Sequence, residues 1–153
     1  GGCLKLSTKG RYGLRALIDL ALYSENETVS IQSIARRQNI SDSYLEQLMR
    51  KLRSAGLIVS VRGAQGGYKL ARPANEISVG DVLRALEGSL EAVTCGGEDN
   101  SCQGADLCVT KFVWERINSS IRDTVDSIKL SQLVEESRLM REKGQIQVQK
   151  CDN

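Results

Sequence analysis

The sequence predicts a mainly α-helical fold with one small β-hairpin: a winged helix-turn-helix domain joined to a long dimerisation helix. Three segments with the apolar spacing of helices come first, and two short strand-like runs around a glycine-rich turn follow them. A later segment carries a long apolar stripe, which a helix must bury against a partner. The chain has 153 residues, 41% of them apolar, which is enough to build a core.

The first three helices are expected to start at hydroxyl caps, and the third is expected to end at Gly56. The first spans about 8–24, because apolar residues recur there at helical spacing, and a shorter helix follows. The expected caps are Ser7 or Thr8 for the first helix, Ser30 for the second and Ser41 for the third. The buried stripe of the third helix is expected to consist of Leu45, Leu48, Met49 and Leu52.

The runs LIVSVR and GYKLAR flank the turn GAQGG and predict the hairpin, or wing. Pro73 closes this unit, and SVGDVLRALEG predicts a further helix. The long helix is expected from Thr110 to about Lys129, and LSQLVEESRLM predicts a short last helix. The stripe of the long helix consists of Val113, Ile117, Ile121, Val125 and Ile128, broadened by Phe112 and Trp114. A symmetric second copy is the simplest cover for it, and the alternative is a monomer whose helix packs back on its own domain.

Four regions follow from this pattern. They are a DNA-binding domain at 1–73, a linking helix with a cysteine loop at 74–109, a dimerisation helix with a C-terminal helix at 110–140, and a flexible tail at 141–153. Charge divides along the same line, since residues 1–72 hold 12 Lys/Arg against 5 Asp/Glu, whereas the rest holds 9 against 14. A basic first half can neutralise phosphates, although two solvated faces with chance asymmetry would look the same.

The third helix is the candidate reader of DNA, because the second helix of a helix-turn-helix enters the major groove with its N-terminal residues at base edges. Its outward residues at the start are Ser43, Tyr44, Glu46 and Gln47. Gln47 can pair with adenine, while Glu46 can accept from cytosine and also repels phosphate. Tyr44 has a second interpretation as a core aromatic. Arg62 on the wing can enter a narrow minor groove, or it can be a solvated arginine on an ordinary hairpin.

Three of the five cysteines lie in one glycine-spotted loop of a chain without histidine. Cys95, Cys102 and Cys108 have the spacing C-x6-C-x5-C, which matches neither the pairs of zinc ribbons nor a ferredoxin run. A metal centre is one interpretation, and buried or redox-sensing thiols are the other. Cys3 and Cys151 lie near the chain ends and carry little weight.

The stretches KLSTKGRYGLRAL, SYLEQLMRKLR, VRGAQGGYKL and CQGADLCVTKFVW resemble the iron–sulfur cluster regulators of the Rrf family of bacterial winged-helix transcription factors. The resemblance covers nearly everything from Lys5 to about Val134. It implies a homodimer joined through the long helix, a palindromic DNA site, and a 2Fe–2S cluster on Cys95, Cys102 and Cys108. It places residues that contact or screen DNA at Ser41, Ser43, Tyr44, Glu46, Gln47 and Arg62.

Two features depart from the pattern of these regulators. They commonly carry a histidine as fourth ligand three residues after the last cysteine, where this chain has Lys111, and the first cysteine gap is longer by one residue. A protonated lysine has no lone pair to give, so another group must complete the site. The candidates are Glu98, Asp99, Asp106, a residue of the partner subunit, Cys3 or water, and the sequence does not choose among them.

The resulting hypothesis is a transcriptional regulator that senses iron–sulfur status and controls cluster assembly genes. The alternative is a cluster-free relative that responds to a partner protein or to thiol oxidation. An enzyme is disfavoured, because the chain has no histidine base and no nucleotide-binding glycine motif. No apolar run approaches the length of a membrane span, and a cytoplasmic location is expected.

Overall fold

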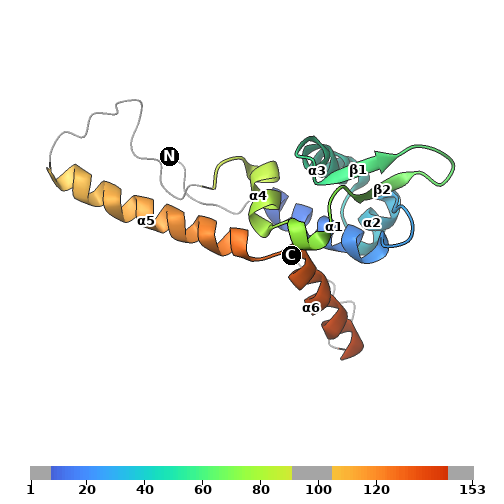
Figure 1. Ribbon diagram of the computed structural model, residues 1–153. Helices are drawn as coiled ribbons and strands as arrows, with labels where there is room; N and C mark the ends of the chain where they lie inside the picture. Colours follow the sequence, from blue (N-terminus) through green and yellow to red (C-terminus); the bar gives the residue numbers. More distant parts are fainter. Residues whose placement is uncertain (1–7, 91–104, 145–153) are drawn as a thin grey trace.

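The computed structural model describes residues 8–90 and 105–144 of the chain (Figure 1). The elements, in order, are α1 (Thr8–Tyr23), α2 (Ile31–Gln38), α3 (Asp42–Ser54), β1 (Ile58–Val61), β2 (Gly67–Leu70), the 3-10 helix η1 (Ala74–Glu76), α4 (Val79–Glu87), α5 (Ala105–Ser127) and α6 (Leu130–Glu142). The predicted mainly α fold with one hairpin is therefore confirmed. None of the helices in the described ranges is long and apolar enough to cross a membrane.

Serine caps fix the starts of α2 and α3, as the sequence predicts. The Ser30 hydroxyl accepts from the Ser33 N–H at 3.2 Å, and the Ser41 hydroxyl accepts from the Tyr44 N–H at 3.3 Å. Gly56 follows α3 with φ +76°, a left-handed conformation that glycine adopts without strain. The expected choice between two caps for α1 is not resolved, because Ser7 lies outside the described residues.

The core lies between α1, α3 and α4, with contributions from α2, β1 and α6. The four residues expected to form the buried stripe of α3 are all at most 1% exposed, and Leu17 and Leu20 of α1 are fully buried against them. Leu130 and Val134 bring the first turns of α6 into the same core. The winged domain thus buries the apolar side of each of its helices within its own chain.

The wing is a two-stranded antiparallel sheet with register from Ile58↔Leu70 to Val61↔Gly67. Val29 extends it by one bridge, since its N–H donates to the Tyr68 carbonyl at 2.9 Å and its carbonyl accepts from the Tyr68 N–H at 2.7 Å. Gly67 permits this approach, because a Cβ there would lie 2.6 Å from the Val29 carbonyl oxygen. The wing is therefore fastened to the segment that precedes α2.

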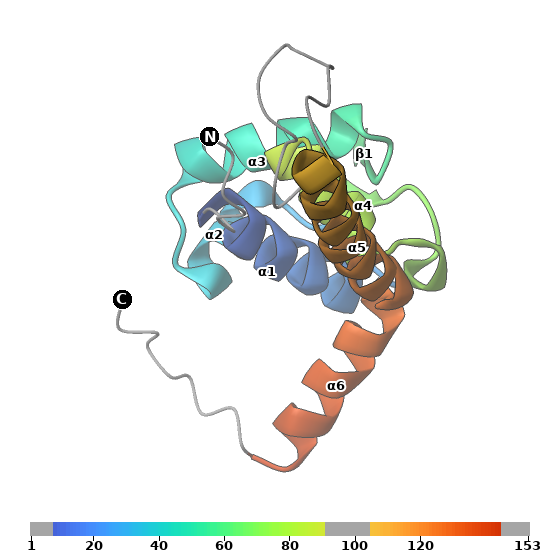
Figure 2. The ribbon, with the colours of Figure 1, turned by 90° about the vertical axis from the view of Figure 1, so that its left-hand side faces the viewer.

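A short clamp joins the winged domain to α5 and α6. The Val79 N–H donates to the Ile128 carbonyl and the Leu130 N–H donates to the Ile77 carbonyl, both at 2.8 Å. Beside this clamp, Arg84 of α4 makes a two-pronged ion pair with Asp126 of α5 at 2.7 and 2.8 Å. From this joint α5 projects away from the domain in one direction and α6 in another (Figures 1 and 2).

The long helix begins earlier than the sequence analysis expects. It starts at Ala105 instead of Thr110 and ends at Ser127, whereas α6 runs on to Glu142. The segment 105–109 contains neither glycine nor proline and includes alanine and leucine, which favour helix, so the helix extends back to the residue after Gly104. As a result Cys108 belongs to the backbone of α5 and not to the preceding loop.

Candidate DNA-binding face and cysteine loop

The turn between α2 and α3 sets the direction of the candidate reading helix. Asn39 after α2 has φ 55°, a left-handed conformation that asparagine tolerates better than most residues, and its N–H donates to the Ala35 carbonyl. Two residues later Ser41 caps α3. The chain therefore turns sharply between the two helices, as a helix-turn-helix requires.

The structure exposes three of the residues expected to read DNA along one side of α3. Ser43, Glu46 and Gln47 are solvent-exposed, whereas Leu45 and Leu48 between and beside them are buried. Ser41 is also exposed, but its hydroxyl is occupied by the helix cap. Side chains at this spacing lie next to one another on a helix surface, so they form one continuous face.

Arg50 belongs to the same face and was not singled out by the sequence analysis. It is exposed and follows Glu46 by four residues and Gln47 by three, so the helical period alone would have found it. A guanidinium at this place supplies the positive charge that a phosphate contact needs.

Tyr44 is placed differently from its neighbours. Its side chain is half-buried against the core, and its ring meets the edge of Tyr12 with centroids 6.0 Å apart and planes at 90°. Its hydroxyl is buried and has no hydrogen-bond partner among the described residues. This placement favours the packing interpretation of Tyr44 over a direct DNA contact.

Arg62 lies exposed at the end of β1, where the wing turns. The next residue, Gly63, has φ +126°, which a side chain would rarely permit, and its carbonyl accepts from the Gly66 N–H at 2.9 Å. The Thr28 hydroxyl donates to the Gln65 carbonyl at 2.5 Å and ties the tip of the turn to the domain. Arg62 is therefore exposed beside a turn that is held by one hydrogen bond within the turn and by one from Thr28.

The cysteine loop lies mainly outside the described residues. This holds for Cys95 and Cys102, while Cys108 is located in the first turn of α5 by its backbone only. No group of three metal-ligating side chains occurs in the part of the chain that the structure describes. The three thiols remain candidate ligands by their chemistry, since thiolates hold iron–sulfur clusters.

Lys111 does not fit the role of a fourth ligand. It lies three residues after Cys108 on α5, is exposed, and its ammonium faces the Glu115 carboxylate at 4.0 Å. An ammonium is a donor without a free electron pair, so it cannot coordinate iron in this state. A cluster on the three cysteines would therefore need a fourth ligand other than Lys111.

The apolar stripe of α5 divides into a covered and an uncovered half. Val125 and Ile128 pack against Val79, Leu83 and Leu90 near α4. Towards the other end the exposed fractions rise to 38% for Ile117, 45% for Val113 and 63% for Phe112. Packing back on the same chain thus accounts for only the half of the stripe that lies nearest the joint.

Comparison with known proteins agrees with this architecture. The model of the Rrf2 family, described as an iron-dependent transcriptional regulator, matches residues 6–136. The HTH-type transcriptional regulator IscR of Pectobacterium atrosepticum is 44% identical over 137 residues, which cover 90% of this chain and 83% of that protein.

Two solved structures have similar folds. IscR of T. potens is 48% identical with a TM-score of 0.70, and the match covers 88% of each chain. CymR, the global cysteine regulator of B. subtilis, is 39% identical with a TM-score of 0.74, and the match covers 87% of this chain and 98% of that one.

Proposed function

The chain belongs to the Rrf2 family of transcriptional regulators, and from this membership we propose a homodimer that senses iron–sulfur status through a 2Fe–2S cluster and controls cluster assembly genes. The family consists of DNA-binding regulators and not of enzymes. The single observation that supports the DNA half most strongly is the exposed face of Ser43, Glu46, Gln47 and Arg50 on α3. We also propose a cytoplasmic location, because a transcriptional regulator must reach the DNA that it binds.

In this proposal α3 enters the major groove and Arg62 on the wing enters the neighbouring minor groove. The Gln47 amide pairs with the edge of adenine, and Arg50 contacts a phosphate. Glu46 accepts from cytosine and repels phosphate when no such base faces it, so it lowers the affinity for other sites. Ser41 and Tyr44 act through the cap and the packing that hold this helix turn in place.

Cys95, Cys102 and Cys108 would hold the cluster, with a fourth ligand that is neither histidine nor Lys111. When bound, the cluster supplies a redox-active and oxygen-sensitive group whose presence depends on iron and sulfide supply. It can change DNA binding only by as much as it favours one state of the dimer over the other. Since Cys108 lies on α5, the cluster would act on the same helix that carries the uncovered apolar residues.

The second copy would cover the outer half of α5. Residues as apolar and as exposed as Phe112 and Val113 are typical of the centre of a homodimer interface. Two copies related by a two-fold axis would present two α3 faces to two half-sites of a palindrome, roughly 34–36 Å apart.

The test is spectroscopy on protein purified without oxygen, combined with iron and sulfide analysis and DNA binding. We expect a coloured protein with iron and sulfide in equal amounts and protection of two half-sites on a palindrome. DNA affinity should fall steeply with salt, because each phosphate contact releases counterions. A colourless protein free of iron and sulfide would contradict the cluster, and affinity independent of salt would contradict the DNA contacts.

A second candidate function keeps the DNA binding without the cluster. The solved CymR structure has a TM-score of 0.74 to this chain, and Lys111 takes the place of the usual histidine. In this alternative a partner protein or oxidation of the cysteines controls DNA binding. DNA affinity that changes on thiol oxidation in iron-free protein would favour it.

A further inference from the structure

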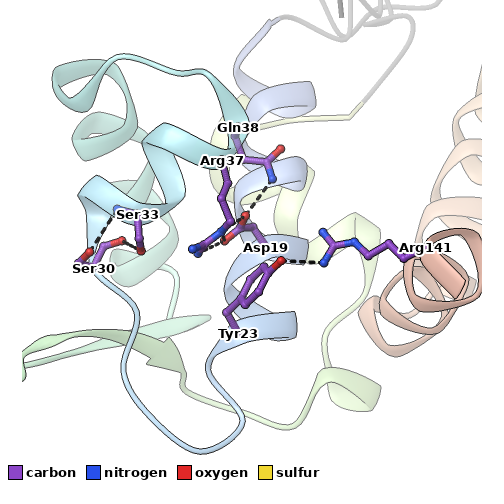
Figure 3. A network of polar contacts seen from close by, with 7 residues as sticks. All are labelled: Asp19, Tyr23, Ser30, Ser33, Arg37, Gln38 and Arg141. Atoms are coloured by element: carbon purple, nitrogen blue, oxygen red, sulfur yellow. Dashed lines mark hydrogen bonds and ion pairs between the residues drawn. The ribbon is translucent and has the colours of Figure 1, made fainter. Parts of the chain in front are cut away.

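Asp19 is a buried carboxylate in the C-terminal half of α1, and two side chains at the end of α2 donate hydrogen bonds to it (Figure 3). Its side chain has no exposed surface. The Arg37 guanidinium donates to both of its oxygens, through Nη2 at 2.7 Å and Nε at 2.9 Å. The Gln38 amide also donates to Asp19, at 2.9 Å. A charge without water needs such partners, so these bonds fix α2 against α1.

The two residues that donate to Asp19, Arg37 and Gln38, are the last residues of α2 and directly precede the turn between α2 and α3. Arg15 of α1 holds the same place from another side, since it donates to the Gln38 carbonyl at 2.7 Å. The hydrogen bonds between Arg37 and Asp19 raise the pKa of Arg37 above its ordinary value, which shows that Asp19 stabilises the charged guanidinium. The position of the reading helix therefore depends on polar contacts at the end of α2.

Tyr23 connects these contacts to the C-terminal helix. The Arg37 guanidinium carbon lies 4.0 Å from the centre of the Tyr23 ring, which is a cation–π contact. On its other end the Tyr23 hydroxyl accepts from Nη1 of Arg141 in α6 at 2.8 Å (Figure 3). Beside it, Arg138 of α6 makes an ion pair with Glu25. The C-terminal helix thus touches the ring on which Arg37 rests.

The two ends of α6 are attached in different ways. Its first turns are buried in the core through Leu130 and Val134, whereas Leu139 and Met140 near its end are about two-fifths exposed. The far end is held by two polar side chains, Arg141 on Tyr23 of α1 and Arg138 on Glu25, which follows α1. Contacts of this kind in water are weak one by one, so the far end can be released without unfolding the domain.

We propose that Asp19, Tyr23, Arg37 and Gln38 form a positioning cluster through which docking of α6 sets the geometry of α3 and hence the specific affinity for DNA. With Arg141 on Tyr23, the ring is held under Arg37, and Arg37 and Gln38 keep the end of α2 in place. When the end of α6 leaves, the ring is free to turn and Arg37 loses this support. The inference rests on the proposed DNA binding for its output, but its structural part concerns the free protein.

The first experiment compares Arg141→Met with Lys143→Met in the full chain. Each substitution removes one positive charge from the end of α6, but Lys143 has no hydrogen bond or ion pair to a side chain among the described residues. The probe is a duplex selected from random sequence by the unaltered protein, with a scrambled duplex for non-specific affinity. We expect Arg141→Met to lower the ratio of specific to non-specific affinity about two- to five-fold, as the loss of an exposed cation–π support implies.

Amide hydrogen exchange on the free protein gives a readout that needs neither DNA nor iron. Arg141→Met should accelerate exchange in the last turn of α2 and the first turn of α3, and Lys143→Met should not. If the two substitutions changed exchange and the affinity ratio equally, Arg141 would act only through its positive charge and not through its contact with Tyr23. That result would overturn the proposal. Unchanged exchange and an unchanged affinity ratio for Arg141→Met would overturn it as well. A failure of the unaltered protein to bind DNA would instead contradict the proposed function. The exchange data would still test the positioning cluster.

Tyr23→Phe tests the connection itself, because it removes the hydroxyl and keeps the ring under Arg37. It should lower the affinity ratio by no more than Arg141→Met does, because Arg141→Met removes the hydrogen bond to the hydroxyl and also the contact of the Arg141 guanidinium with the ring at 5.5 Å. The double variant should lower the ratio no further than Arg141→Met alone. Additive effects would show that the two residues act separately and would overturn the proposal.

Arg37→Gln and Arg36→Gln separate positioning from charge on α2. The side chain of Arg36 is exposed and forms no hydrogen bond or ion pair with another described residue. Arg37→Gln should lower the affinity ratio more than Arg141→Met does, whereas Arg36→Gln should leave the ratio unchanged. A ratio lowered equally by both would contradict a role of Arg37 in positioning.

Discussion

Two helices of this chain carry an apolar stripe, but the stripe of α3 is buried and the outer half of the stripe of α5 is exposed. In α3 the residues Leu45, Leu48, Met49 and Leu52 are at most 1% exposed. In the outer half of α5 the exposed fractions are 45% for Val113, 63% for Phe112 and 65% for Val109. An apolar stripe shows that a helix needs cover, but it does not show whether the cover comes from the same chain.

The polar sides of the two helices differ as well. The exposed face of α3 combines Gln47, Glu46 and Arg50, which suits base edges and phosphates. The inner half of α5 carries Asp126, which is engaged by Arg84 of the same chain. We therefore propose recognition as the role of α3 and assembly as the role of α5, and substitutions in the two helices should affect different measurements.

The largest effect on folding is expected in α3. Leu48→Ala removes a side chain that is 1% exposed, and it should lower the free energy of unfolding by about 2–5 kcal/mol. Urea denaturation followed by circular dichroism measures this loss. The neighbouring Gln47→Ala, at an exposed position, should stay within about 0.5 kcal/mol of the unaltered protein. Equal losses in the two variants would contradict the buried stripe.

The corresponding change in α5 should break the assembly and leave the fold intact. Phe112→Ser should weaken dimerisation by about 2 kcal/mol or more, as loss of a central apolar anchor does. Sedimentation over a range of concentrations would detect the shift to monomer, while circular dichroism should stay unchanged. Asp123→Ser on the exposed polar side of α5 is the control and should remain dimeric. If the unaltered protein sedimented as a monomer, the proposed role of α5 in assembly would be contradicted.

Recognition by α3 is expected to depend on single side chains. Gln47→Ala should reduce discrimination between the selected site and a site with the contacted adenine replaced, by about 1–3 kcal/mol. Arg62→Ala should weaken binding to all sequences more evenly and reduce the salt dependence by about one counterion. Competition binding at several salt concentrations distinguishes the two patterns. The opposite assignment of patterns would show that the wing, and not α3, reads the bases.

The smallest effect is expected for the ion pair between Arg84 of α4 and Asp126 in the inner half of α5. The Arg84 guanidinium, chiefly by its hydrogen bonds, lowers the pKa of Asp126 below its usual value. A carboxylate with a lowered pKa in the folded state stabilises above its unfolded pKa, and this contribution is lost as the pH falls through the folded pKa. Both side chains are more than a third exposed, so the pair contributes at most about 1 kcal/mol.

Asp126→Asn tests this sign. The variant should be slightly less stable than the unaltered protein near neutral pH, and the difference should shrink as the solution is acidified below about pH 4, where carboxylates take up protons. Thermal unfolding at several pH values measures it. A difference that grows on acidification would contradict the assigned direction.

Local signals in the sequence were sufficient for the winged domain. Ser30 and Ser41 mark their helices because a cap depends on residues three positions apart. The wing follows from alternating strands around glycines, and Arg50 could have been found by extending the helical period of α3.

Tertiary contacts were not predictable in the same way. Asp19 in α1 gives no local sign that it is buried, because its partners Arg37 and Gln38 are 18 and 19 residues away. The structure starts α5 five residues before the expected Thr110, because helix-forming residues already begin where the cysteine pattern predicts a loop. The resemblance implied the roles of Cys95 and Cys102, which lie outside the described residues and stay a prediction.

The most direct test of the central proposal is one titration of the selected palindrome with protein kept free of oxygen, before and after removal of iron. The account predicts that the protein carries iron and sulfide, and that its affinity for the palindrome changes when they are removed. Replacement of Cys95, Cys102 and Cys108 by serine should reproduce the affinity of the iron-free protein. A protein that carries neither iron nor sulfide, and binds the palindrome with the same affinity throughout, would contradict the account.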